Sequence, residues 1–383
     1  MNPRELITAI WAGQPVDRLP MNGIWPWGET MERWRREGMP EGVHPASYLE
    51  ILSDRGCGLP LNLNMVPPFP IRILQMGDDY VTLVDEFGVT KKVLRTDYDR
   101  SGGYKGAAGA MSSMSHWLDF PVKDLRSWKA IYEERFQPTL AGRLPDDWQQ
   151  KGRAAYIEES KARWASFFCF PLCGLFGPMR EMMGVEGLAY VMADDPGLIR
   201  TIVGDLVAFW LETFAKVLDG EVRLDQTMFF EDMCATKAPM IGPAGFRGFM
   251  ASGYSRFIGG MREMGVKEFW VDTDGNAWSL LPELIACGVT GISPCEAQAD
   301  MDVVRLREAF PTLNLAGGIA KRALVEGPAA IDAELRRCFT VAWQKGRYTP
   351  SLDHGAPPDI PWKHAMHYAE GIKKWSKREG FGL

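Results

Sequence analysis

The feature that most constrains the fold is a regular alternation of strand-like and helix-like segments between residues 166 and 375. Each short apolar run is followed by a longer segment with apolar residues at three- and four-residue spacing. This alternation predicts a parallel β-sheet with helices outside it. The strands predicted in this part of the chain are residues 166–172, 227–232, 269–271, 290–295, 313–318 and 348–353.

Two further strands are predicted nearer the N-terminus, at residues 19–25 and 58–66. Eight such units would close into a (β/α)8 barrel, so we expect an α/β fold in which residues 1–383 form a single barrel. Length alone would also allow two domains, and a doubly wound open sheet is the alternative topology. No Gly-x-Gly-x-x-Gly follows an early strand, so the dinucleotide fingerprint is absent.

Residues from about 67 to 150 interrupt this alternation and are predicted to be an insertion in the barrel. Two strand-like runs at residues 80–84 and 89–94 flank the polar sequence Asp85-Glu86-Phe87-Gly88. This arrangement is typical of an antiparallel hairpin.

Charge and cysteine content exclude several classes of function. The net charge is -6 and no long basic run occurs, which argues against nucleic acid as a partner. The seven cysteines form no Cys-x-x-Cys pair and are odd in number, so we expect reduced thiols in a cytoplasmic protein. We expect no signal peptide and no membrane span, because no apolar run is long enough.

Polar side chains follow most of the predicted strands. In a barrel the chemistry lies at the carboxyl ends of the strands, so these side chains are the candidate site. Some of them could instead form salt bridges that only hold the barrel together. The candidates are Trp25, Trp27, Asn62, Asn64, Glu231, Asp272, Asp274, Lys321 and His354.

Asp272 and Asp274 are two positions apart at a predicted strand end, so both could face one cavity. Buried like charges need a cation, a shared proton or strong donors, although Asp274-Gly275 could also be simple turn chemistry. His354 could serve as acid, base or ligand, or could only bond Asp353. Asp272, Asp274 and His354 would suit a divalent metal such as zinc, but no His-Glu-x-x-His supports it.

Several motifs resemble the uroporphyrinogen decarboxylase superfamily across nearly the whole chain. They are Arg4-Glu5 to Pro20, Pro171-Leu172-Cys173-Gly174, Phe230-Glu231-Asp232-Met233, Val271-Asp272-Thr273-Asp274-Gly275-Asn276, Gly317-Gly318-Ile319 and Asp353-His354-Gly355-Ala356-Pro357-Pro358. Members of that superfamily are (β/α)8 barrels, in agreement with the strand count. They include the decarboxylase and methyltransferases linked to corrinoids and coenzymes.

The chain departs from both well-known branches of that superfamily. The decarboxylase's arginine-rich motif is replaced here by residues 23–28, Gly-Ile-Trp-Pro-Trp-Gly, and its catalytic aspartate by the region of Asn62 and Asn64. The zinc motif of the thiol-directed methyltransferases is replaced by residues 272–275, Asp-Thr-Asp-Gly. The resemblance is therefore to the branch of corrinoid-dependent O-demethylases.

The resemblance implies a methyltransferase that passes a methyl group between a small oxygen-linked substrate and a corrinoid carried by a partner protein. Glu231, Asp272 and His354 would be catalytic, and Trp25, Trp27, Asn62, Asn64 and Lys321 would contact the substrate. A decarboxylase-like lyase acting on a tetrapyrrole or smaller carboxylate is the alternative. A non-enzymatic corrinoid or tetrapyrrole binding protein is a third, and a homodimer is compatible with each.

Overall fold

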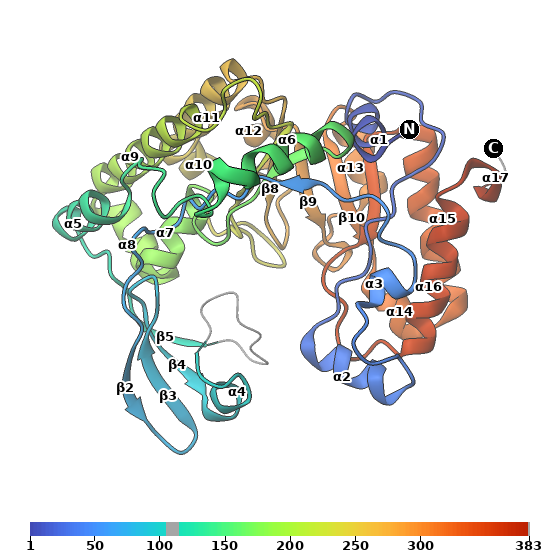
Figure 1. The fold of residues 1–383 in the computed structure, drawn as a ribbon, viewed down its shortest axis with the longest axis horizontal. Coiled ribbons are helices and arrows are strands. Elements are labelled where there is room, and N and C mark those ends of the chain that lie inside the picture. The colour runs from blue at the N-terminus through green and yellow to red at the C-terminus, as the bar shows by residue number, and fades with distance from the viewer. Residues whose placement is uncertain (105–114, 382–383) are drawn as a thin grey trace.

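A curved parallel sheet forms the centre of the protein (Figure 1). The computed structural model describes residues 1–104 and 115–381, and in these residues the sheet has seven strands in the order β1-β6-β7-β8-β9-β10-β11. Neighbouring strands pair in parallel throughout. The strands are β1 (Cys57–Gly58), β6 (Ala165–Phe167), β7 (Gln226–Phe230), β8 (Glu268–Asp272), β9 (Gly291–Cys295), β10 (Asn314–Ile319) and β11 (Tyr348–Leu352).

Helices follow these strands and cover the outside of the sheet, which confirms the predicted α/β barrel (Figure 1). The long helix α9 buries one apolar face that includes Ile199, Ile202 and Leu206. The barrel helices are α6 (Arg153–Ala162), α7 (Phe176–Met183), α8 (Val185–Asp194), α9 (Pro196–Ala215), α10 (Pro243–Phe249), α11 (Ala251–Glu263), α12 (Leu281–Ala286), α13 (Val303–Ala309), α14 (Lys321–Glu326), α15 (Pro328–Lys345) and α16 (Trp362–Trp375).

The two N-terminal strands were predicted too long. Of the segment 58–66 only Gly58 belongs to a strand, and in the segment 19–25 only Asn22 makes an isolated bridge, to Leu52. The amide of Ala356 donates to the carbonyl of Trp25 at 2.8 Å, so this irregular segment lies beside the residues that follow β11. Pro20, Pro26 and Pro60 lack the N–H that a strand ladder needs, which explains the irregular backbone.

The predicted hairpin is confirmed and belongs to a larger antiparallel sheet that projects from the barrel (Figure 1). Val81, Leu83 and Val93 pack on one face of this sheet, and Lys91 makes a buried ion pair with Asp85 at 2.8 Å. The elements of this part are β2 (Arg72–Met76), β3 (Tyr80–Val84), β4 (Thr90–Leu94), α4 (Arg95–Arg100), β5 (His116–Asp119), α5 (Leu125–Arg135) and the π-helix η1 (Trp148–Gly152).

Helix α1 (Pro3–Trp11) covers the amino end of the barrel. Ile7 and Trp11 form a buried cluster with Trp270 of β8, and the Trp11 and Trp270 ring centroids are 6.1 Å apart. The carboxyl ends of the strands therefore remain as the accessible end. The remaining helices are α2 (Gly28–Arg36), α3 (Pro45–Tyr48), the 3-10 helix η2 (Ala297–Ala299) and α17 (Arg378–Phe381).

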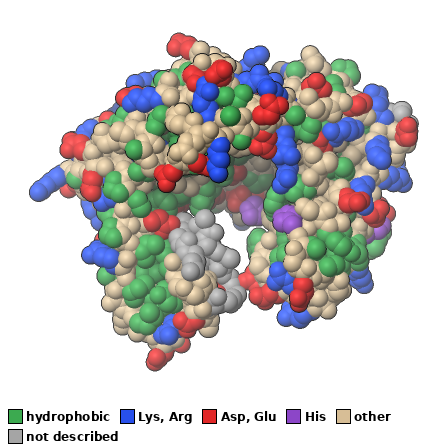
Figure 2. Space-filling model, in the orientation of Figure 1, with side chains coloured by type: hydrophobic (Ala, Val, Ile, Leu, Met, Phe, Trp, Pro, Cys, Tyr) green, Lys and Arg blue, Asp and Glu red, His purple; other side chains and the backbone are tan. Residues whose placement is uncertain are grey.

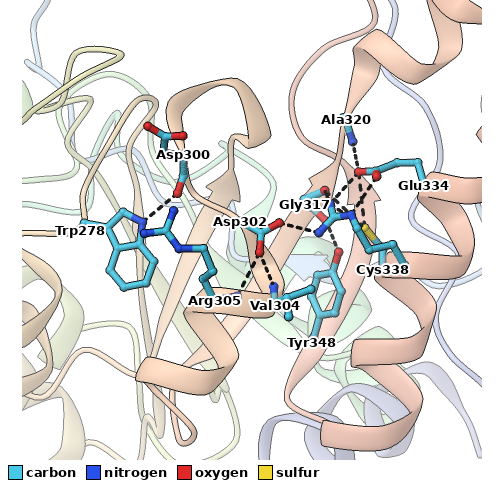
Figure 3. A network of polar contacts seen from close by, with 12 residues as sticks. Trp278, Asp300, Asp302, Val304, Arg305, Gly317, Ala320, Glu334, Cys338 and Tyr348 are labelled. Carbon is cyan, nitrogen blue, oxygen red and sulfur yellow. Dashed lines mark hydrogen bonds and ion pairs between the residues drawn. The ribbon is translucent and has the colours of Figure 1, made fainter. Parts of the chain in front are cut away.

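A dense polar network fixes the carboxyl end of β10 to the helices behind it (Figure 3). Arg337 binds Asp302 at 2.6 Å and Glu334 at 2.7 Å, and the hydroxyl of Tyr348 donates to the carbonyl of Gly317 at 2.8 Å. The amide of Ala320 donates to Glu334 at 2.9 Å. This network sets the position of the turn that begins α14.

Candidate functional site

The candidate active site is a cavity of about 370 Å³ at the carboxyl ends of β8, β9 and β11. In the same end of the molecule, Figure 2 shows a hollow with histidine side chains at its inner edge. The segment before α2 closes one side of the cavity. The lining residues are Asn22, Gly23, Ile24, Trp25, Asp272, Asp274, Ser293, Pro294, Ser351, Leu352, His354 and Gly355.

Asp274 and His354 are 80 residues apart along the chain, but they are adjacent in space and form an ion pair in this cavity. The distance from His354 Nε2 to Asp274 Oδ2 is 3.3 Å. The hydrogen bond to Asp274 raises the pKa of His354, while burial opposes it. The pair with Asp274 therefore favours the protonated form of His354 more than water does for a free histidine.

Asp272 is the last residue of β8 and lines the same cavity. Its partners in register are Phe230 of β7 and Ser293 of β9. Burial, followed by the charges of Asp274 and Asp232, raises the pKa of Asp272 to about 7, and His354 lowers it. Asp272 can therefore hold a proton at neutral pH, as a general acid must.

Asp232 contributes to this electrostatic environment, although sequence reasoning did not select it as a site residue. Its backbone has a positive φ of 41°, which is uncommon for a residue other than glycine. Arg180 Nη1 donates to the Asp232 carboxylate at 2.6 Å and to its carbonyl at 2.9 Å, and Arg180 also binds Glu181 at 2.9 Å. Asp232 is thus a fixed negative charge beside Asp272.

Glu231 lies outside the cavity lining, beneath the start of α7, and is 0% exposed. Its carboxylate accepts hydrogen bonds from the amides of Leu175 at 2.8 Å, Phe176 at 2.7 Å and Gly177 at 2.8 Å, and from the hydroxyl of Tyr254. Burial raises the pKa of Glu231, and these bonds oppose the shift. This environment gives Glu231 a structural role, and the predicted exchange of protons with substrate stays a prediction.

The segment just before α7 approaches β7 so closely that position 174 must be glycine. A Cβ atom at position 174 would lie 2.1 Å from the carbonyl oxygen of Phe230, so only glycine fits there. The Glu231 amide in turn donates to the carbonyl of Asp272 at 2.9 Å. The Glu231 contacts therefore help to hold the end of β8 in place.

Trp25, Trp27 and Lys321 lie at or near the cavity. Trp25 lines it and is exposed, with its ring against His44 at 5.3 Å between centroids. The indole Nε1 of Trp27 would be 2.7 Å from a Cβ on Gly355, so Trp27 packs on the loop after β11. Lys321 pairs with Glu296 at 3.5 Å, and its charge lowers the pKa of His354.

Asn62 and Asn64 do not line the cavity with Asp272 and His354. Asn64 Nδ2 donates to the carbonyl of Phe170 at 2.9 Å, and its Oδ1 accepts from the amide of Leu172 at 3.2 Å. The Asn64 amide donates to Asn62 Oδ1 at 2.9 Å. In this structure both side chains hold the loop that follows β6, so contact with substrate stays a prediction.

The predicted metal ligands are Asp272, Asp274 and His354. Among residues 1–104 and 115–381, no group of three or more His, Cys, Asp or Glu side chains is arranged to hold a metal ion. Asp272, Asp274 and His354 share the cavity but do not converge as such a group. We therefore derive no step through a metal, and the zinc-type site stays a prediction.

All seven cysteines are free and buried, in agreement with the expected reduced thiols. Among the residues that the structure describes, no helix has the length and apolar character needed to cross a membrane.

Comparisons with known proteins agree with the barrel fold. The family model of uroporphyrinogen decarboxylase (URO-D) matches residues 176–375, more than half of the chain. The chain belongs to the uroporphyrinogen decarboxylase family. A methyltransferase from Methanosarcina mazei has a similar structure, with a TM-score of 0.53 and 14% identity over 97% of this chain and 98% of that one. At this identity the similarity shows the fold alone. No curated protein sequence matches the chain.

The region matched by the uroporphyrinogen decarboxylase family model contains the cavity residues Asp272, Asp274 and His354. Asn22 to Trp25 lie outside it and complete the cavity from the N-terminal segment. Sequence reasoning also missed Ser293 and Ser351, because a lone serine in a strand carries no distinctive signal. Membership of this family indicates an enzyme.

Proposed function

We propose that this protein is a methyltransferase that passes a methyl group between a small oxygen-linked substrate and a corrinoid carried by a partner protein. The observation that carries the proposal is the meeting of Asp272 with the Asp274–His354 pair in one cavity. The pKa of Asp272 is about 7 and that of His354 is raised, so both can hold a proton near neutral pH. Family membership and the methyltransferase fold of a structural relative agree with this proposal.

The chemistry of an ether explains why such proton donors are useful. When a methyl group leaves an ether for the corrinoid, the carbon–oxygen bond breaks and its electron pair stays on oxygen. Protonating that oxygen stabilises the leaving group, and a positioned general acid typically accelerates such a step about 10²- to 10⁴-fold. Asp272 is placed to donate this proton, and the His354 imidazolium is the second donor.

The composition of the cavity indicates the kind of substrate. Among the described residues, its lining includes Asp272, Asp274 and His354 but neither lysine nor arginine. A substrate with several carboxylates, such as uroporphyrinogen, would find only His354 as a positive partner on these walls, and His354 is already paired with Asp274. The cavity is therefore better matched to a neutral ether or alcohol.

The test is methyl transfer from a panel of methyl ethers to free reduced corrinoid. We expect turnover by the wild type, with strong losses for Asp272→Asn and His354→Gln. The matched control is His367→Gln, because His367 pairs with Asp332 at 2.8 Å on the surface of α16, away from the cavity. Absence of methyl transfer with every ether would refute the proposal.

Decarboxylation of a tetrapyrrole or smaller carboxylate is the second candidate. The same observation supports it, because a protonated Asp272 or His354 could protonate the carbanion left by loss of carbon dioxide. Release of carbon dioxide from a carboxylate panel, without methyl transfer, would favour this function.

The predicted divalent metal can be tested separately. Metal analysis of protein purified without chelator would compare the wild type with Asp272→Asn. A metal bound through Asp272, Asp274 and His354 predicts a lower metal content in the variant. Equal content in both proteins would contradict the metal site.

A further inference from the structure

A second cavity, of about 250 Å³, lies between the insertion and the barrel. The insertion contributes Trp117 of β5 and Phe120, and the junction of α7 with α8 contributes Gly184 and Val185. We call these four residues the aryl pocket. Arg180, Glu181 and Asp232 form its polar edge.

Among the residues that the structure describes, the polar edge of this cavity has no unpaired positive charge. Arg180 binds the carboxylate of Asp232 at 2.6 Å and that of Glu181 at 2.9 Å. One guanidinium faces two carboxylates, so the edge is negative overall and would repel an anionic ligand. The remaining walls are aromatic and aliphatic, which suits a neutral aromatic ring.

The aryl pocket is connected to the candidate active site through Asp232. The Asp232 carboxylate bounds the pocket, while its amide donates to the carbonyl of Asp272 at 3.3 Å. The Asp232 charge also contributes to the raised pKa of Asp272. Asp232 therefore lies between the aryl pocket and Asp272.

We propose that the aryl pocket binds the neutral aromatic group of the substrate whose ether oxygen lies beside Asp272 and His354. An apolar cavity of about 150 Å³ can hold benzene, so about 250 Å³ has room for a substituted ring. This proposal rests on the proposed methyl transfer for the identity of the oxygen-linked part. The pocket itself can be tested by binding alone.

The experiment measures binding of 4-methoxytoluene and 4-methoxybenzoate to the whole protein by calorimetry, without a methyl acceptor. We expect the neutral probe to bind and the anionic probe to bind at least about tenfold more weakly. Val185→Trp would fill the pocket and weaken 4-methoxytoluene about tenfold or more. Its control is Tyr190→Trp on the same helix, because Val185 is 52% exposed and Tyr190 62%, so both variants should fold.

A second pair of variants tests the opposite wall. Trp117→Ala removes a ring of the aryl pocket and should weaken 4-methoxytoluene about tenfold, whereas Leu118→Ala should change its Kd less than about twofold. Trp117 is 42% exposed and Leu118 44%, but only Trp117 lines the pocket. Equal effects within either pair, equal binding of both probes, or no binding to the wild type would overturn the aryl pocket.

The outcome also separates this proposal from the proposed function. Binding that is lost in Val185→Trp and Trp117→Ala, with no methyl transfer by the wild type, would support the pocket and refute the methyltransferase. Methyl transfer by the wild type, with unchanged 4-methoxytoluene binding in both pocket variants, would support the methyltransferase and refute the pocket.

Discussion

Two carboxylates at the ends of adjacent strands, Glu231 after β7 and Asp272 at the end of β8, have opposite environments. Glu231 is enclosed beneath α7 and accepts four hydrogen bonds. Asp272 faces a cavity and has the like charges of Asp274 and Asp232 nearby. The same chemical group therefore serves structure in one place and is available for chemistry in the other.

The difference follows from the direction in which each side chain points. In a strand, alternate residues face opposite sides of the sheet. Phe229 packs on Tyr254 and Phe257 of α11, so Glu231, two positions later, also points towards the helices. Asp272 lies two positions after Trp270 and therefore faces the same side of the sheet. Trp270 packs with Trp11 inside the barrel. Environment, and not residue type, decides which carboxylate can exchange a proton with substrate.

The largest expected effect is on stability, from Glu231→Ala. The change leaves three buried amides and one hydroxyl without their acceptor, so we expect a loss of about 3 kcal/mol or more in the free energy of unfolding. Denaturant titration measures it. Glu231→Gln keeps an acceptor oxygen and should lose less. Equal stability of Glu231→Ala and the wild type would contradict the structural role of this carboxylate.

The next effect is on catalysis, from Asp272→Asn. Because the amide cannot donate the acidic proton, we expect kcat for methyl transfer to fall about 100-fold or more. The variant should be no less stable than the wild type above pH 7, because it lacks the charge that the cavity disfavours. A stability loss as large as that of Glu231→Ala would show that Asp272 is also structural.

The pH dependence of stability gives the same comparison in another form. The folded-state pKa of Asp272 is about 7 and its ordinary value is 3.8. Between these two pH values the folded protein therefore binds more protons than the unfolded chain. The contribution of Asp272 to stability should therefore fall as pH rises from about 4 to about 7. Denaturant titrations across this range should show a smaller fall for Asp272→Asn. Parallel curves for both proteins would contradict the raised pKa.

The smallest expected effect comes from Asp274→Asn, which removes the partner of His354. The pKa of His354 should fall, as measured by NMR titration of its ring protons. A histidine whose pKa is raised on folding stabilises the folded protein fully at pH values below its unfolded-state pKa. This contribution is lost as the pH rises through its folded-state pKa. We expect a stability loss of about 0.5 kcal/mol at pH 5, because the pair is partly exposed, and none at pH 9. An unchanged His354 pKa would contradict the pair.

The sequence was sufficient to predict the barrel and the meeting of Asp272, Asp274 and His354. Alternating apolar runs identify strands and helices, and the barrel brings the strand ends together. The environment of Glu231 could not be predicted in the same way, because its donors are backbone amides of α7, which no residue type specifies. The sequence signal for Glu231 was its position two residues after the apolar Phe229, because residues two apart in a strand face the same side. The irregular N-terminal segment is set by contacts such as Trp25 with Ala356, across more than 300 residues.

The most direct test of this account is the pKa of Asp272 in the intact protein, measured by ¹³C NMR of the labelled aspartate carboxyls, with Asp272→Asn to assign the signal. The account predicts an apparent pKa of about 7, which falls in Asp274→Asn because one like charge is removed. A value at or below about 4 would mean that Asp272 is fully ionised at neutral pH, and the proposed proton donor would not exist.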